Sequence, residues 1–163
     1  MTALTPRRGT VVILATFVIA VVLAVMPLPE WARLYRPNWS ALVLTYWALA
    51  LPLRVGVGVG FLVGLLLDSL TGTLLGQNAL ALSLIAYISV KTHQRVRLFP
   101  LWQQSVFVLA LLLVDRLIAT VVIGATGREA PGLPFWASAG IGGLLWPWAY
   151  FVLRDLRRRF RVS

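Results

Sequence analysis

Three charged residues stand inside long apolar runs and are the strongest candidates for chemistry in this chain: Asp68, Asp115 and Arg116. Asp68 ends the run "GLLLD", and the other two lie within "LALLLVDRLIAT". Charged side chains are costly in apolar surroundings, so such residues face the interior of a helix bundle or a partner. We therefore expect polar contacts between helices or with a partner, and a proton or ion relay is the functional alternative.

Position along the chain pairs Asp68 with Arg116. Asp68 lies 14 residues after Arg54, and Arg116 lies 14 residues after Trp102. If Arg54 and Trp102 mark the inner edge of the membrane, both charges lie roughly 21 Å from it at about 1.5 Å per helical residue. Neighbouring helical residues point about 100° apart, which makes Asp115 a poor partner for Arg116. We expect Asp68 and Arg116 to meet inside the bundle, directly or through one water.

No enzyme-like arrangement accompanies these charges. The chain has no cysteine, which excludes disulfides, thiolate catalysis and zinc–thiolate sites. Its one histidine, His93, lies in the basic segment "VKTHQRVR" and is predicted to be a solvated loop residue. The sequence contains no HExxH, GxSxG or Walker motif, and "GVGVG" at 56–60 lies inside an apolar run rather than at a strand-to-helix turn. We predict no catalytic residue, no cofactor and no metal site.

The elements that must position these residues are apolar helices. The chain has 163 residues, of which 60% are hydrophobic and 12% are charged, and the apolar residues form unbroken blocks. A soluble domain has more charge and amphipathic periods. The sequence therefore predicts a single all-α integral membrane domain over 1–163, a six-helix transmembrane bundle. The predicted spans are about 9–26, 39–53, 55–75, 78–90, 102–124 and 134–153, followed by a basic cytoplasmic tail over 154–163.

Two features leave the number and depth of the spans open. The second and fourth spans fall below the roughly 20 residues that cross a bilayer. They must thin the membrane, borrow flanking residues or lie partly inside the bundle. The third and fourth could also break near Thr71–Gly76, which leaves a five-span count as an alternative. The pair Arg7–Arg8 before an apolar run imitates a signal peptide, but the small-residue cleavage pattern is missing, so we predict a retained span.

Basic residues predict the orientation. The net charge is +10, and the charges lie between apolar blocks and at the two ends, which fits membrane topology better than nucleic-acid binding. With the N-terminus in the cytoplasm, eleven basic residues fall on inner segments and three on outer ones, so both termini are predicted cytoplasmic. The outer three are Arg33, Arg36 and Arg128. Interfacial tryptophans are predicted at outer ends (Trp31, Trp39, Trp136) and inner ends (Trp102, Trp146, Trp148), with Trp47 packed mid-span.

Small residues predict where helices touch. Gly56, Gly60 and Gly64 are spaced by four and share one helix face, which allows two backbones to approach closely in lipid. Glycines recur after Asp68 at Gly72 and Gly76, and we include them in the candidate helix-packing face. This face packs within the monomer, or it receives a partner or a second copy of the chain. The last span has similar pairs: Ala139 with Gly143 and Ser138 with Gly142.

Landmarks along nearly the whole chain resemble the MreD family of rod shape-determining proteins of Gram-negative bacteria. They occur in the family's order, which is more specific than any one of them. The motifs are "RPNW" at 36–39, "YW" at 46–47, "LPLRVGVGVGF" at 51–61, "DSLTGTLLG" at 68–76, "ALALSLIAY" at 79–87, "LWQQ" at 101–104, "VDR" at 114–116 and "LWPWAYF" at 145–151.

The resemblance implies a non-enzymatic part of the cell-elongation machinery in the bacterial inner membrane. Proteins of this family associate with the membrane-anchored periplasmic protein MreC, with the filament protein MreB, and with the glycosyltransferase and transpeptidase that extend side-wall peptidoglycan. The resemblance also implies a fold similar to the six-helix substrate-binding component of energy-coupling-factor transporters.

Two other functions are alternatives to that role. One is a substrate-binding membrane module of a transporter, with an outward cavity lined by Asp68, Asp115, Arg116 or the loop after the first span. The other is an intramembrane enzyme, which would need a nucleophile–base pair that this sequence lacks. A homo-oligomer is compatible with the glycine face.

Overall fold

The chain is all-helical in a computed structural model that describes residues 5–27, 29–30, 36, 38–52, 54–72, 75–129 and 132–160, without the side chains of residues 5–8 and 134. Within these ranges six helices and no strand occur, which confirms the predicted all-α class and the helix count. The helices are α1 (Thr5–Val25), α3 (Trp39–Ala50), α4 (Val57–Thr71), α5 (Gln77–Arg97), α6 (Leu101–Ala125) and α7 (Leu133–Arg159).

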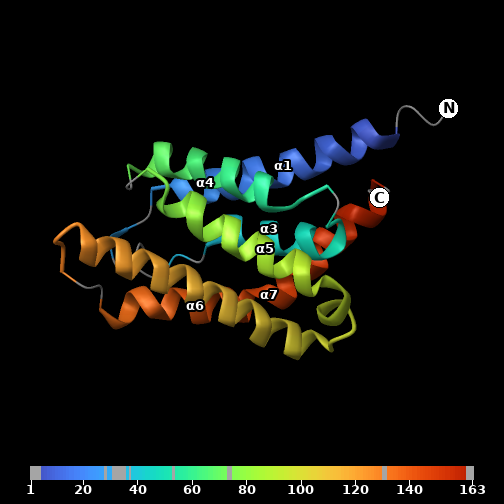
Figure 1. The fold of residues 1–163 in the computed structure, drawn as a ribbon. Coiled ribbons are helices and arrows are strands. Elements are labelled where there is room, and N and C mark those ends of the chain that lie inside the picture. Colours follow the sequence, from blue (N-terminus) through green and yellow to red (C-terminus); the bar gives the residue numbers. More distant parts are fainter. Residues whose placement is uncertain are drawn as a thin grey trace.

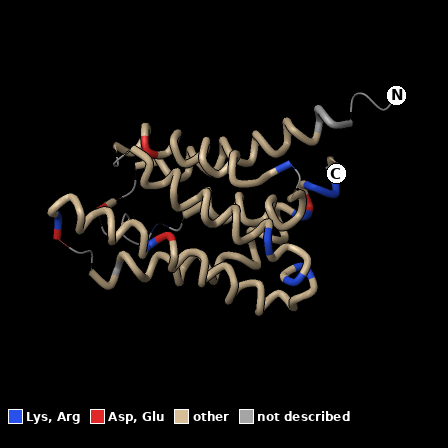
Figure 2. Tube along the Cα trace, in the orientation of Figure 1, with Lys and Arg blue, Asp and Glu red and all other residues tan. Residues whose placement is uncertain are grey.

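The six helices lie side by side and alternate in direction (Figure 1). The starts of α1, α4 and α6 and the ends of α3, α5 and α7 share one end of the bundle with both chain termini. Most lysines and arginines also gather there, so we call it the basic end (Figure 2). The other end, called the opposite end, contains the turn between α4 and α5.

The short helix α3 forms the centre of the bundle. It packs against α1, α5, α6 and α7, and ten of its twelve residues are buried. Its Trp47 is fully buried, as predicted, and donates a hydrogen bond from Nε1 to the Thr16 hydroxyl at 2.9 Å. A helix surrounded by protein need not match the thickness of a bilayer, because neighbouring helices cover its ends. For the short span predicted at 39–53, the burial of this 12-residue helix favours a position inside the bundle over the other two possibilities.

The other five helices form the apolar outer surface of the bundle. Large apolar side chains are exposed on α1, α4, α5, α6 and α7, among them Leu62, Val121 and Leu144. In the described ranges, one helix is long and apolar enough to cross a membrane by length and composition, namely Leu101–Ala125. The segments Gly9–Val25, Trp39–Ala50 and Val57–Thr71 are apolar but shorter.

At the basic end, the predicted loop around His93 was wrong, and part of the predicted basic tail is helical. Helix α5 continues to Arg97, so the basic segment around His93 is helical rather than a loop, and His93 Nδ1 lies 2.6 Å from the carbonyl oxygen of Val90. Helix α7 likewise includes residues 154–159 of the predicted tail. Lysine and arginine are good helix formers, and cations in the last turn interact favourably with the helix dipole. The two helices therefore extend beyond their apolar stretches.

Several predictions concern residues outside the described ranges. These are the interfacial position of Trp31, the outer position of Arg33, the last residue of the second span (Leu53), residues 73–74 of the third span, and the end of the tail with Arg161. Trp146 was predicted at an interface, but its side chain is fully buried. Trp102 is 66% exposed, as an interfacial side chain would be.

Candidate functional site

Asp68 lies in the last turn of α4, and its carboxylate caps the next helix. Oδ2 accepts hydrogen bonds from the backbone N–H groups of Gly76 at 2.8 Å and, more weakly, Ala79 at 3.4 Å. Oδ1 accepts from both the backbone N–H and the side-chain amide of Asn78, each at 3.0 Å. The first N–H groups of a helix have no partner within it and carry partial positive charge. The acid, 2% exposed, therefore ties α4 to the start of α5.

Two of the predicted glycines do bring helix backbones together. A Cβ atom on Gly64 would lie 2.3 Å from the Cα of Ala79, and one on Gly60 would lie 2.7 Å from the carbonyl oxygen of Leu82. No larger residue fits at these distances, so both positions allow α4 and α5 to touch. Within the chain this contact already occupies the Gly60–Gly64 face, which removes it as a surface for a partner or a second copy.

The other three glycines do not belong to a packing face, which corrects the prediction. Gly72 and Gly76 have φ of 72° and 103°, and a Cβ on either would meet nothing within 4 Å. Glycine adopts this left-handed conformation at little cost. Gly72 ends α4 and Gly76 precedes α5, so together they form the turn that Asp68 closes. Gly56 is the N-cap of α4, and a Cβ there would lie 4.0 Å from the carbonyl oxygen of Pro52.

The predicted pairing of Asp68 with Arg116 was wrong. Arg116 Nε lies 3.9 Å from Asp115 Oδ2, and its guanidinium carbon lies 4.7 Å from the ring centroid of Phe135. Helix α4 packs mainly against α5, while α6 packs against α5 and α7. The equal depth expected from residue number therefore does not bring the two charges together, because their side chains contact different neighbours.

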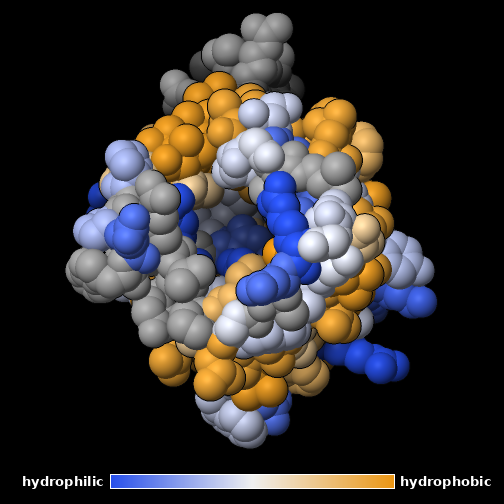
Figure 3. Space-filling model, turned by 90° about the vertical axis from the view of Figure 1, so that its left-hand side faces the viewer, coloured by the Kyte–Doolittle hydropathy of each residue, from blue (hydrophilic) through white to orange (hydrophobic). Residues whose placement is uncertain are grey.

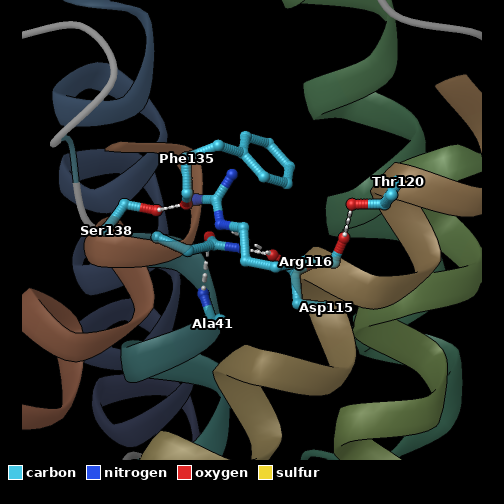
Figure 4. A network of polar contacts seen from close by, with 7 residues as sticks. Ala41, Asp115, Arg116, Thr120, Phe135 and Ser138 are labelled. Carbon is cyan, nitrogen blue, oxygen red and sulfur yellow. Dashed lines mark hydrogen bonds and ion pairs between the residues drawn. The ribbon is translucent and has the colours of Figure 1, made fainter. Parts of the chain in front are cut away.

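The second polar group joins the starts of α3 and α7 to the middle of α6 (Figure 4). Asn38 donates from Nδ2 to Asp115 Oδ2 at 3.2 Å, and its Oδ1 accepts from the backbone N–H of Ala41 at 3.1 Å. Asn38 thus caps α3 and holds the buried Asp115 carboxylate at the same time. The ion pair with Arg116 and the ring of Phe135 complete the group.

This polar group lines a cavity of about 350 Å³ near the opposite end. Figure 3 looks onto that end and shows a hollow with hydrophilic residues inside it. Arg36 also lines it and donates to the carbonyl oxygens of Ala24 and Met26 at the end of α1. Two guanidinium groups, one carboxylate and several amides suit a small dipolar or anionic group. The lining residues are Ala24, Arg36, Asn38, Leu67, Thr71, Gln77, Asn78, Ala81, Asp115, Arg116, Ala119, Ile123 and Phe135.

Some of these residues are visible as candidates in the sequence, and others are not. Asp115 and Arg116 line the cavity as an outward site would require, whereas Asp68 faces the start of α5 instead. Arg36 and Asn38 belong to the loop after the first span, which was expected as a possible cavity lining, but neither residue was named by itself for a site. An asparagine directly before an apolar run is a helix-start signal, so "RPNW" could have identified Asn38 as a cap. No sequence signal pointed from Asn38 to Asp115, which lies 77 residues away.

Comparisons with known proteins agree with the landmarks. Residues 6–156 match the model of the family described as rod shape-determining protein MreD. The chain is similar to the rod shape-determining protein MreD of Haemophilus influenzae, with 37% identity over 150 residues, which cover 92% of this chain and 93% of that protein. No solved structure matches the chain. Because both matches extend over nearly the whole length, the chain belongs to the MreD family of rod shape-determining membrane proteins.

Proposed function

We propose that this chain is a non-enzymatic component of the bacterial cell-elongation machinery, which maintains rod shape by holding the wall-synthesis proteins together in the membrane. The observation that carries this proposal is family membership over residues 6–156. The described polar residues support it, because Asp68 and Asp115 are engaged in contacts between helices.

The proposed setting is the inner membrane, crossed several times, with both termini in the cytoplasm. Exposed apolar side chains on five helices support contact with lipid on most of the bundle's flank. The arginines at the basic end support a cytoplasmic location for that end, since basic residues are enriched on the cytoplasmic side. Shielding of α3 by its neighbours removes the main objection to a bundle that contains so short a helix.

The proposed partners are MreC, bound directly, and MreB with the peptidoglycan glycosyltransferase and transpeptidase, reached through the complex. Since the Gly60–Gly64 face is occupied by α5, a partner helix must use another flank. Nothing in this proposal requires a cofactor or a nucleic acid.

Co-expression with MreC tests the proposal. The tagged chain, extracted in mild detergent, should retain MreC through size-exclusion chromatography. The gene for this chain should also restore rod shape to cells that lack their own MreD protein. A folded, monodisperse chain that never retains MreC and leaves such cells round would remove the support for a scaffold.

The cavity near the opposite end favours a second candidate, a substrate-binding membrane module of a transporter. Arg36, Asn38, Asp115 and Arg116 offer charge and amide groups to a small polar molecule there. Native mass spectrometry of the purified chain would reveal a retained small molecule, and Arg116→Gln should abolish its retention. An empty cavity in the native chain, together with unchanged rod-shape rescue by Arg116→Gln, would count against the transporter alternative.

A further inference from the structure

We propose that the basic end contains a phosphate-binding site between α3, α5, α6 and α7, whose source of phosphate is an anionic phospholipid of the surrounding membrane. The site is a cavity of about 110 Å³. This is room for several waters or one phosphate group, since a water occupies about 30 Å³ in the liquid. Its polar lining comes from Tyr46, Arg97, Gln104, Tyr150, Arg154 and Arg157. We call it the basic-end pocket.

One face of α7 builds half of the basic-end pocket. Trp146, Tyr150, Arg154 and Arg157 all line it, and their spacing of four, four and three places them on one side of a helix. Two arginines on this face therefore point toward Arg97 from α5. Among the described residues no carboxylate lines the pocket, and the nearby acid Asp155 pairs with Arg159 at 2.9 Å.

The buried floor of the pocket offers polar atoms that the protein leaves unused. Trp146 is fully buried, and its indole Nε1–H has no hydrogen-bond acceptor in the described part of the chain. The buried Gln104 donates from Nε2 to the carbonyl oxygen of Val96 at 3.1 Å, while its Oε1 has no partner there. Buried polar groups are normally paired, so each exception requires an explanation. A phosphate oxygen would accept from the indole, and a headgroup hydroxyl or water would donate to Oε1.

The three arginines are placed to bind an anion, because no acidic side chain among the described residues lines the pocket beside them. Arg97 is anchored by donating from Nε to the carbonyl oxygen of Leu49 at 2.7 Å and from Nη2 to that of Ala50, at the end of α3. Arg157 lies within hydrogen-bonding reach of the Tyr46 hydroxyl. Arg154 makes no hydrogen bond or ion pair with another described residue. Guanidinium groups bind phosphate oxygens with strong, directional hydrogen bonds.

The surroundings favour a lipid over free phosphate. Basic pockets between membrane helices on the cytoplasmic side bind anionic headgroups. Beside the pocket, α7 exposes Phe151 and Val152 on its flank, where acyl chains would lie. A lipid bound there contacts α7 through its tails and α3, α5 and α7 through its phosphate, whereas inorganic phosphate has only the second contact.

Phosphatidylglycerol, phosphatidylcholine and inorganic phosphate are the three probes of the test. Each is titrated into the detergent-purified full chain, and both thermal stability and lipid retention in native mass spectrometry are measured. Phosphatidylglycerol should bind and stabilise the chain, and phosphatidylcholine should do so far less. Equal effects of the two lipids would overturn the proposal without needing any variant. Inorganic phosphate that binds as tightly as phosphatidylglycerol would overturn the lipid assignment and indicate a soluble ligand.

Matched variants separate a built site from general attraction to a basic surface. Arg154→Gln should weaken phosphatidylglycerol binding by about tenfold, as loss of a hydrogen bond to a charged group would. Arg158→Gln makes the same charge change at an exposed neighbour that does not line the pocket, and it should leave binding nearly unchanged. Equal losses in both variants would overturn the site. The unfolding temperature without lipid shows whether Arg154→Gln folds, and none of these readouts needs MreC, so failure here leaves the proposed function untouched.

Discussion

Asp68, Arg36 and Arg97 each contact the end of a helix. Asp68 accepts from N–H groups at the start of α5, whereas Arg36 donates to carbonyl oxygens at the end of α1 and Arg97 to those at the end of α3. The sign matches the helix dipole each time, with an anion at an N-terminus and cations at C-termini. In an apolar setting, each of these contacts satisfies both the charged side chain and the unpaired backbone groups at the helix end.

Removing the Asp68 carboxylate should destabilise the bundle. Asp68→Ala leaves the N–H groups at the start of α5 without their acceptor, and an unsatisfied buried donor costs about 1–3 kcal/mol. Asp68→Asn should lose less, because its amide oxygen still accepts. Ser69→Ala is the control, since that exposed hydroxyl bonds only to the carbonyl of Leu65 in its own helix. Thermal unfolding in detergent measures all three, and equal melting of Asp68→Ala and Ser69→Ala would contradict the capping role.

Two double-mutant cycles distinguish true partners from residues that share only a depth. Asp68→Ala and Arg116→Ala should destabilise additively, because their side chains contact different elements. Asn38→Ala and Asp115→Ala should instead couple by about 0.5–3 kcal/mol, the range for residues in contact. The readout is the unfolding free energy in detergent. Clear coupling in the first cycle, or none in the second, would require a different polar arrangement.

At the scale of elements, the hairpin of α4 and α5 is the tightest unit of the bundle. The two helices are joined by the Gly72–Gly76 turn, closed by Asp68, and brought together at Gly60 and Gly64. These three features depend on one another, because the backbones of α4 and α5 can approach only if the turn sets the direction of α5. The motif "DSLTGTLLG" therefore describes one structural unit: an acid, a helix stop, and a glycine before the next helix.

A methyl group at Gly64 should separate the hairpin. Gly64→Ala places Cβ against the backbone of Ala79, which cannot move aside as a flexible side chain can, and overpacking costs about 1–3 kcal/mol. Gly58→Ala is the matched control, because a Cβ there meets nothing within 4 Å and alanine favours helix. Melting temperature and folded yield should fall for the first variant alone. Similar behaviour of the two variants would show that α4 and α5 are not in close contact.

At the scale of the whole molecule, a buried helix packs against four neighbours, and all five of the other helices have apolar flanks. Helix α3 supplies most of its surface to the core, while α1, α4, α5, α6 and α7 expose large apolar residues outward. Both termini lie at the basic end, and the polar cavity lies near the opposite end (Figures 1 and 3). The two ends of the bundle are thus chemically different, which suits a protein with one face toward each side of a membrane.

Reporter fusions test this polarity. A cytoplasmic reporter joined after Ser163 should be active, while fusions at Arg36 and Arg128 should be active only with a periplasmic reporter, because both residues belong to the opposite end. The expectation comes from the excess of basic residues at the end with the termini. A periplasmic signal at Ser163 would reverse the orientation and also place the basic-end pocket outside the cytoplasm.

The sequence by itself determined the helical class, the six helices and the family. Unbroken apolar blocks predict buried or lipid-facing helices whatever their neighbours are, and landmarks in a fixed order identify relatives without reference to packing. It also located the polar residues that matter, since a charge inside an apolar run is visible in one dimension. The helical conformation of the basic segments that end at Arg97 and Arg159 was not visible, because basic residues continue a helix without any apolar signal.

Only the tertiary structure decided which groups meet. Depth along a helix follows from residue number, but the direction a side chain faces depends on which helices are neighbours, and that is set by packing. Asp68 and Arg116 were expected at one depth, yet Asp68 contacts α5 and Arg116 pairs with Asp115, while Asn38 reaches Asp115 across 77 residues. The same reason applies at Trp146: it lies near the basic end as predicted, but α7 turns its indole into the basic-end pocket rather than toward lipid.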